Sequence, residues 1–196
     1  MRIRRVPRST QLGECVAEVL GLRPTTTASH VRNLREAHLL TKTGRGITGA
    51  HMTPRDAAHL LIAATCSQDV KDSVETVRRY GKLPHVGNAW RDFPALAALG
   101  EQHTFADALA TLLDSASIQF LASDPKSTVF VTFDYPNVEA RLEVSTHDWE
   151  RVQEYKLPWP RKSKTTTRAH VGDRHVRYIF SEQTIFTVGN LLRGEG

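Results

Sequence analysis

The chain of 196 residues has no long apolar segment. No stretch approaches the roughly 18 to 20 consecutive apolar residues that a membrane-spanning helix needs. The basic start, with Arg2, Arg4, Arg5 and Arg8, is not followed by the apolar core of a secretory signal peptide. These absences predict a cytoplasmic protein with no membrane partner.

Cysteine is scarce, with only Cys15 and Cys66 in the chain. Each lies in an apolar helical pattern, without a second cysteine or a histidine at a zinc-ligand spacing. Both are therefore interpreted as small core residues. The closest approach to a metal motif is His51 with His59, eight residues apart across a proline, which is a weak signal. We expect no metal and no cofactor.

The usual catalytic signatures are also missing. There is no GxxxxGKS or GxxxxGKT phosphate loop, no GxSxG elbow, no HExxH and no acidic cluster suited to two-metal nuclease chemistry. Asp134, Glu139 and Glu143 lie on an expected hairpin, where acids more often balance cross-strand bases such as Arg141. We therefore expect that the protein is not an enzyme.

Basic residues are concentrated in the first third of the chain. Residues 1–66 hold ten Lys or Arg against four Asp or Glu, residues 67–124 hold five against eight, and residues 125–196 hold eleven against nine. The whole chain has a net charge of +5. A basic excess confined to one segment fits a polyanionic partner for that segment.

Two amphipathic helices are predicted in this basic segment. The first runs from Ser9, with Ser9 or Thr10 as its N-cap, to a stop at Gly21. The second runs from about Thr26 to Ala37. Its expected buried stripe is Ala28, Val31, Leu34 and Ala37. Its expected polar face is Ser29, His30, Arg32, Asn33 and Arg35.

A glycine-rich basic segment follows the second helix. After Leu39-Leu40 the sequence TKTGRGITGAHMTP has three glycines that permit a tight hairpin tip around Arg45. The run from HVRNLREAHLL to TKTGRG resembles the winged helix-turn-helix superfamily, over about residues 9–65. The resemblance implies that the second helix reads DNA and that Arg45, on the wing, lies on phosphates or in the minor groove.

DNA contacts are accordingly expected on the second helix and the wing. Arg32 and Arg35 have the reach and the fork geometry to read guanine, while their neighbours can contact bases or phosphates. A polar face that merely meets solvent is the alternative. The predicted DNA-binding residues are Thr26, Thr27, Ser29, His30, Arg32, Asn33, Arg35, Lys42 and Arg45.

The sequence pattern predicts that the middle of the chain, from Thr53 onward, is helical. Thr53-Pro54 opens a nearly apolar helix that should be the buried spine of the first domain. Its segment TPRDAAHLLIAA also resembles parts of bacteriophage and prophage proteins of unassigned role. Further helices are predicted over residues 69–80 and after Thr104. Residues 1–66 are thus a winged helix-turn-helix domain, and residues 67–124 a helical connector or oligomerisation region.

Residues 125–196 form the third predicted domain, of α+β class. Apolar residues alternate on both sides of a turn at residues 134–137, which predicts a hairpin. A third strand is expected at Val176–Phe180, and a final helix from about Ser181 to Leu192. Together they form a small antiparallel sheet with one helix.

A basic run separates the hairpin from the third strand. In KLPWPRKSKTTTRAH the cations have no acid beside them, which is most often a solvated loop and otherwise a second nucleic-acid contact. The residues concerned are Lys156, Arg161, Lys162, Lys164 and Arg168.

Three functions remain open at this point. The first is a sequence-specific transcriptional regulator that binds double-stranded DNA as a homo-oligomer, preferably a dimer. The second is a viral packaging-recognition protein of the small terminase kind, which would form a ring of many subunits. The third is a protein-interaction module, such as an inhibitor or an assembly factor.

Overall fold

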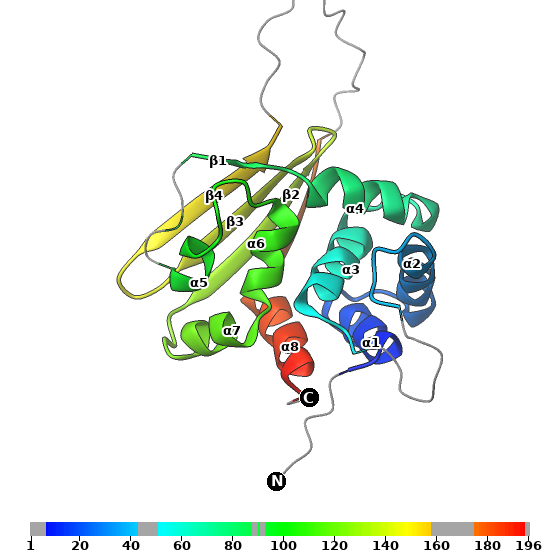
Figure 1. Ribbon diagram of the computed structural model, residues 1–196, viewed down its shortest axis with the longest axis horizontal. Helices are drawn as coiled ribbons and strands as arrows, with labels where there is room; N and C mark the ends of the chain where they lie inside the picture. Colours follow the sequence, from blue (N-terminus) through cyan, green and yellow to red (C-terminus); the bar gives the residue numbers. More distant parts are fainter. Residues whose placement is uncertain (1–6, 43–50, 88–89, 91–92, 158–174, 195–196) are drawn as a thin grey trace, which may run out of the picture.

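The computed structural model describes residues 7–42, 51–87, 90, 93–157 and 175–194. Helices lie on one face of a five-stranded antiparallel sheet (Figure 1). The predicted α+β class, with a small antiparallel sheet and a final helix, is confirmed. The wing stays a prediction, because residues 43–50 lie outside the described residues.

The first two helices are α1 (Ser9–Val19) and α2 (Pro24–Glu36), joined by a four-residue turn. In that turn Gly21 has a φ of 63°, which glycine adopts without strain. The first helix has Arg8 as its N-cap residue, in place of the predicted Ser9 or Thr10. The second begins two residues before the predicted start, because proline at the first helical position has its φ already set for a helix.

Helix α3 (Pro54–Cys66) is the spine of the helical half, as predicted. Thr53 is its N-cap, and eight of its thirteen residues are buried. It packs against the first two helices, against α4 (Ser73–Gly81) and against α6 (Phe105–Leu112). The single helix expected over residues 69–80 is instead a short 3-10 turn, η1 (Val70–Asp72), followed by α4.

The sheet has the strand order β1-β4-β3-β2-β5. Its inner face is built by the alternation that predicted the hairpin, since every second residue is buried from Val129 to Phe133 in β2 and from Ala140 to Val144 in β3. The strands are β1 (His85–Val86), β2 (Thr128–Tyr135), β3 (Glu139–Ser145), β4 (Glu150–Lys156) and β5 (Val176–Ser181).

Two strands and two helices were not foreseen. In β4 only Gln153 and Tyr155 are buried, so its sequence shows no apolar alternation. Strand β1 has only two residues. The unforeseen helices are α5 (Pro94–Ala97) and α7 (Ser115–Ala122). The predicted last helix, α8 (Glu182–Arg193), packs against both α7 and α1, and so brings the two ends of the fold together.

The buried apolar side chains form one continuous core that draws on all three predicted domains. At its centre the ring of Phe133 lies edge-on to those of Phe105 and Tyr80, at centroid distances of 5.4 and 5.6 Å. The hydroxyl of Tyr80 donates to the carbonyl oxygen of Asp134 at 2.8 Å. The predicted boundaries at residues 66 and 124 therefore do not coincide with a break in the core. Within the described ranges, no helix combines the length and apolarity required to span a bilayer.

Candidate nucleic-acid interface

Helix α2 is anchored through a face that is partly polar. Thr27 and His30 are buried beside Val31 and Leu34. The Nδ1 atom of His30 lies 2.7 Å from the hydroxyl oxygen of Ser73. The hydroxyl of Ser73 itself donates to the carbonyl oxygen of Val70. The His30 nitrogen must therefore be the donor in its own hydrogen bond.

Asn33 adds a second polar anchor between α2 and η1. Its Nδ2 donates to the Val70 carbonyl oxygen at 2.8 Å, and its side chain is only partly exposed. The prediction that His30 and Asn33 lie on an outer polar face is therefore wrong, as is the prediction that Ala28 is buried. The helix is rotated because the 3-10 turn and α4 offer hydrogen-bond partners to His30 and Asn33, which no local sequence pattern reveals.

Burial lowers the pKa of His30, and likewise that of His59, whose Nδ1 lies 2.7 Å from the Leu39 carbonyl oxygen. Desolvation is the main cause in both cases, because it disfavours the charged imidazolium. The surroundings of both imidazoles in the helical half thus favour the neutral form.

Acidification should consequently weaken the fold. The folded pKa of His30 lies below the unfolded value of about 6.5, so the unfolded chain binds more protons as the pH falls below that value. Stability should be full above about pH 6.5 and decrease below it, by at most about 1.4 kcal/mol per pH unit for each such histidine. Thermal melts between pH 7.5 and 5.5 would measure this loss.

His30→Asn should reduce the loss of stability between pH 7.5 and 5.5, because the asparagine Nδ2 can replace the Nδ1 donor without titrating. The matched control is His147→Asn, on the exposed loop between β3 and β4, which should leave the pH profile unchanged. A His30→Asn profile as steep as that of the parent would contradict the assignment.

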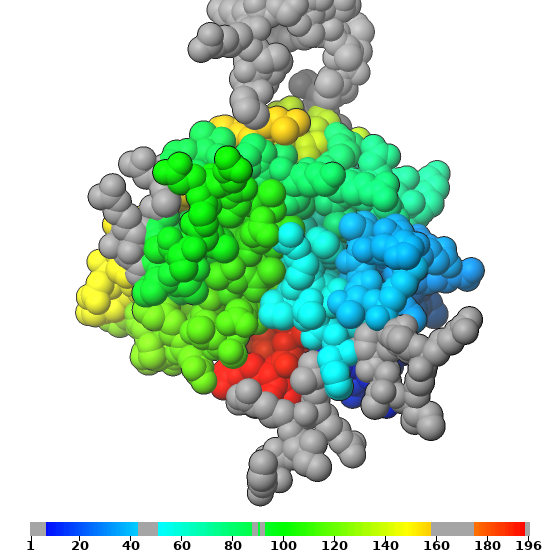
Figure 2. All heavy atoms as spheres, in the orientation of Figure 1, coloured from blue at the N-terminus to red at the C-terminus, as the bar shows by residue number. Residues whose placement is uncertain are grey.

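The other face of α2 is exposed and carries most of its charge. In Figure 2 the blue surface of this helix forms the edge of the molecule beside the cyan surface of α3. Arg32 is largely exposed, but its Nε donates to the Glu36 carboxylate at 2.9 Å. Arg35 is exposed, and its side chain has no ion pair with any described residue. Ser29 is also exposed and bonds back to the carbonyl oxygen of Thr25 at 2.9 Å.

A groove of about 760 Å³ lies between α1 and α2. Its charged lining residues are the cations Arg32, Arg35 and Lys42 and the acids Glu14 and Glu36. The lining is therefore of mixed charge, and within it Glu36 is paired with Arg32. The remaining lining residues are Ser9, Thr10, Gly13, Pro24, Thr25, Ala28 and Val31.

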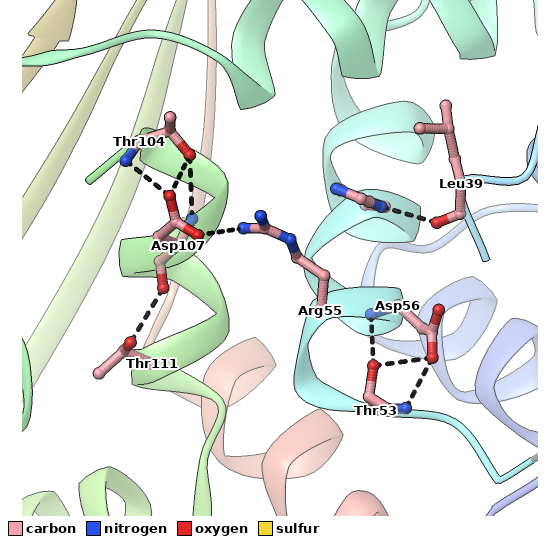
Figure 3. Close-up of polar contacts among 8 residues, drawn as sticks. Leu39, Thr53, Arg55, Asp56, Thr104, Asp107 and Thr111 are labelled. Atoms are coloured by element: carbon pink, nitrogen blue, oxygen red, sulfur yellow. Dashed lines mark hydrogen bonds and ion pairs between the residues drawn. The ribbon is translucent and has the colours of Figure 1, made fainter. Parts of the chain in front are cut away.

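Asp56 joins the two described ends of the chain that flank residues 43–50. Its side chain is buried and accepts from the backbone N–H and hydroxyl of Thr41, at 2.7 and 2.8 Å. It also accepts from the backbone N–H and hydroxyl of Thr53, both at 2.8 Å (Figure 3). This carboxylate therefore holds the chain at Thr41 and at Thr53.

The neighbouring Arg55 ties α3 to α6. Its guanidinium lies 2.7 Å from the carboxylate of Asp107, which closes a second capping box with Thr104 (Figure 3). Burial opposes ionisation of Asp107, but the hydrogen bonds from Thr104 and the charge of Arg55 outweigh it, so its pKa is lowered. Two helix N-termini are thus locked side by side next to the candidate interface.

The remaining predicted contacts are dispersed. Thr26 is half-buried at the start of α2. Lys156 was predicted to have no acid partner, and this is wrong: it lies on β4 and its Nζ is 2.6 Å from the Glu154 carboxylate. The extended backbone of β4 creates that contact, because residues two apart on a strand share a face. Outside the described residues lie Arg45, Arg161, Lys162, Lys164 and Arg168.

The structural roles of Asp56 and Ser73 were not predicted from the sequence. The T-x-x-D spacing from Thr53 to Asp56 is a capping-box signal that could have identified the first, although not its bonds to Thr41. Nothing local marks Ser73 as a partner of His30. Among the described side chains, no three His, Cys, Asp or Glu are grouped so that they could hold a metal ion.

Comparison with protein-family models, with curated proteins and with solved structures finds no match to this chain. Its function is therefore argued from the geometry above.

Proposed function

We propose that the protein binds double-stranded DNA through α2 and the segment that follows it, as a sequence-specific transcriptional regulator. The observation that carries the proposal is the exposed Arg35, which lies in the last turn of α2 and has no acid partner among the described residues. A guanidinium without a carboxylate partner can fork onto guanine or phosphate at little cost.

The two-sided character of α2 supports this role. A DNA-reading helix must be held rigidly by one face and present the other to a groove. Here Thr27, His30 and Leu34 are the anchor, while Ser29 and Arg35 are available for contact. The short turn at Gly21 between the two helices is of the length found in helix-turn-helix motifs.

The DNA contacts predicted from sequence fall into two groups: residues that position α2 and residues that can contact DNA. His30, Asn33 and Thr27 position the helix and do not reach DNA. Arg32 can reach it only by leaving Glu36, so its contribution should be smaller than that of Arg35. Glu14 would repel phosphates from the groove between α1 and α2, whereas Glu36 is paired with Arg32, so we expect DNA to contact Arg35 and Lys42.

Binding to duplex DNA should depend strongly on salt. With some four to six phosphate contacts, affinity should fall by about two to three orders of magnitude between 50 and 200 mM salt. Fluorescence anisotropy with the full chain and a labelled random duplex would measure this dependence. No binding at low salt, or a signal that ignores salt, would reject the proposal.

Replacing Arg35 by alanine should weaken binding to the preferred duplex by about 1 to 3 kcal/mol. Stability should change by no more than about 0.5 kcal/mol, since the side chain is exposed. Arg32→Ala should have a smaller effect on binding. Affinities for a selected duplex and a random duplex, with a melting curve for each variant, would measure these differences.

A matched control is Lys126→Ala, which removes one exposed cation from the loop between α7 and β2, on the opposite side of the molecule from α2 in Figure 1. Equal losses for the Arg35 and Lys126 variants would mean that only net charge matters. Equal losses of Arg35→Ala on both duplexes would make the residue a phosphate anchor and not a reader.

Regulator and packaging protein differ in oligomeric state. A regulator of this kind should be a dimer, whereas a packaging protein of the small terminase kind should be a ring of eight or more subunits. The mass in solution, measured by light scattering, separates the two.

The groove between α1 and α2 favours a second candidate, a protein-interaction module. Its floor is largely apolar, with Ala28 and Val31, and its size suits a side chain or a short peptide segment. Under this alternative the protein would not bind DNA at low salt. Ala28→Glu would then abolish capture of the partner, while Lys126→Ala, which lies outside the groove, would leave it intact.

A further inference from the structure

The groove between α1 and α2 has the size and the lining of a small-molecule site. Its volume of about 760 Å³ lies within the roughly 300 to 1,000 Å³ that is typical of ligand pockets. The side chains of Pro24, Ala28 and Val31 offer it only carbon atoms, and Gly13 adds no side chain. An apolar floor with a few polar groups around it is the usual composition of such pockets. The hydroxyl groups of the lining belong to Ser9, Thr10 and Thr25.

The charged residues of the lining make the groove complementary to a single negative charge. Arg32 is paired with Glu36 at 2.9 Å, so these two charges offset each other. Neither Arg35 nor Lys42 has an ion pair with a described residue. The remaining acid of the lining, Glu14, is exposed on α1. Two cations are therefore left against one acid.

The extent of the groove favours a small molecule over a protein surface. Twelve described residues line it, whereas a stable protein interface uses about 20 to 30 residues on each side. A protein partner would therefore need contacts well beyond the groove, and a small molecule would not. A single carboxylate can fork onto the Arg35 guanidinium. The apolar body, which Glu14 does not repel, can then cover the apolar lining.

We propose that the groove binds a small organic acid, with an apolar ring or chain and one carboxylate, and that this acid competes with DNA for Arg35. The acid is then an effector that releases the protein from its DNA. The competition rests on the proposed DNA-binding function, whereas the ligand site itself does not depend on it.

Two probes of the same shape test the site with the full chain, phenylbutyrate and its uncharged analogue phenylbutyramide. In isothermal titration calorimetry the acid should bind about tenfold more tightly than the amide, because a charge-assisted hydrogen bond to a guanidinium is the stronger one. Arg35→Gln should remove most of this preference and leave the affinity for the amide unchanged. Equal affinities of the parent chain for both probes would overturn the proposal.

Filling the groove tests its location. Ala28 is exposed on α2 and lines the groove, so Ala28→Leu should weaken the binding of both probes without unfolding the chain. The matched control is Ala116→Leu, at an exposed alanine of α7, which should bind both probes as the parent does. In two-dimensional NMR the probes should shift the backbone amide signals of Gly13, Ala28 and Val31. Shifts confined to other elements, or equal binding by the Ala28 and Ala116 variants, would contradict the assignment.

The competition is measured by fluorescence anisotropy with a labelled duplex. Phenylbutyrate at ten times its Kd should raise the apparent Kd for the duplex about tenfold, as mutually exclusive binding requires. Phenylbutyramide at the same concentration should raise it by about twofold at most. An unchanged duplex affinity in saturating acid would overturn the competition.

The two proposals fail in distinguishable ways. If the chain binds duplex DNA but neither probe, the inference is overturned and the proposed function stands. If it binds phenylbutyrate as expected but no duplex, the proposed function fails and the ligand site stands.

Discussion

Replacing Asp56 by alanine should lower the free energy of unfolding by about 3 to 5 kcal/mol, because the change removes a buried carboxylate and the four hydrogen bonds that it accepts from Thr41 and Thr53. For a chain of this size the melting temperature should fall by roughly 6 to 20 °C. Chemical denaturation and thermal melts monitored by circular dichroism would measure both quantities.

The control for this change is Asp114→Ala. Asp114 is also an N-cap acid, but it is exposed and accepts one backbone hydrogen bond, from Ala116 at 3.3 Å. Its loss should cost about 1 kcal/mol. Asp56→Asn, which keeps the volume and one acceptor oxygen, should lie between the two alanine variants. An Asp56→Ala variant no less stable than Asp114→Ala would show that water can replace the hydrogen bonds of Asp56 with Thr41 and Thr53.

Residues 1–66 expressed alone should fail to fold. Helix α3 buries apolar side chains on several sides, and Leu60, Leu61 and Ile62 have no exposed surface. It packs on α4 and α6, which the fragment lacks. Exposing each large side chain costs about 1.5 to 3 kcal/mol, which is comparable with the whole stability of a small domain.

Circular dichroism and a two-dimensional NMR spectrum of the fragment would test this prediction beside the full chain. The full chain should unfold in a single transition, whereas the fragment should give poorly dispersed peaks and no cooperative melt. A fragment that melts cooperatively would support an independent first domain, as the charge division along the sequence suggests. DNA-binding experiments should therefore use the full chain.

The local elements were predictable where one face is apolar and a cap is present. The N-cap residues Thr53 and Thr104 predicted the starts of α3 and α6. The apolar alternation around residues 129–144 predicted β2 and β3. Strand β4 was not predictable, because its place in the sheet comes from pairing with β3 and not from its own polar pattern.

The candidate site was only half predictable. Exposure of Arg32 and Arg35 followed from the spacing of Val31 and Leu34. The ion pair of Arg32 with Glu36 could have been predicted, because residues four apart on a helix are neighbours. That Arg35 has no ion pair with a described residue could be seen only once the neighbouring elements were placed. The buried role of His30 depends on Ser73, 43 residues later in the chain.

By itself the sequence determined the periodic helices and the central hairpin. The reason is that helix and strand geometry places regularly spaced apolar residues on one side of the element, which can then be buried. It also determined that basic charge accumulates near α2. Only the tertiary structure decided which side of α2 is anchored, that Asp56 holds the chain on either side of residues 43–50, and that the predicted domains share one core. These features arise from contacts between residues far apart in the chain, whose partners no local pattern specifies.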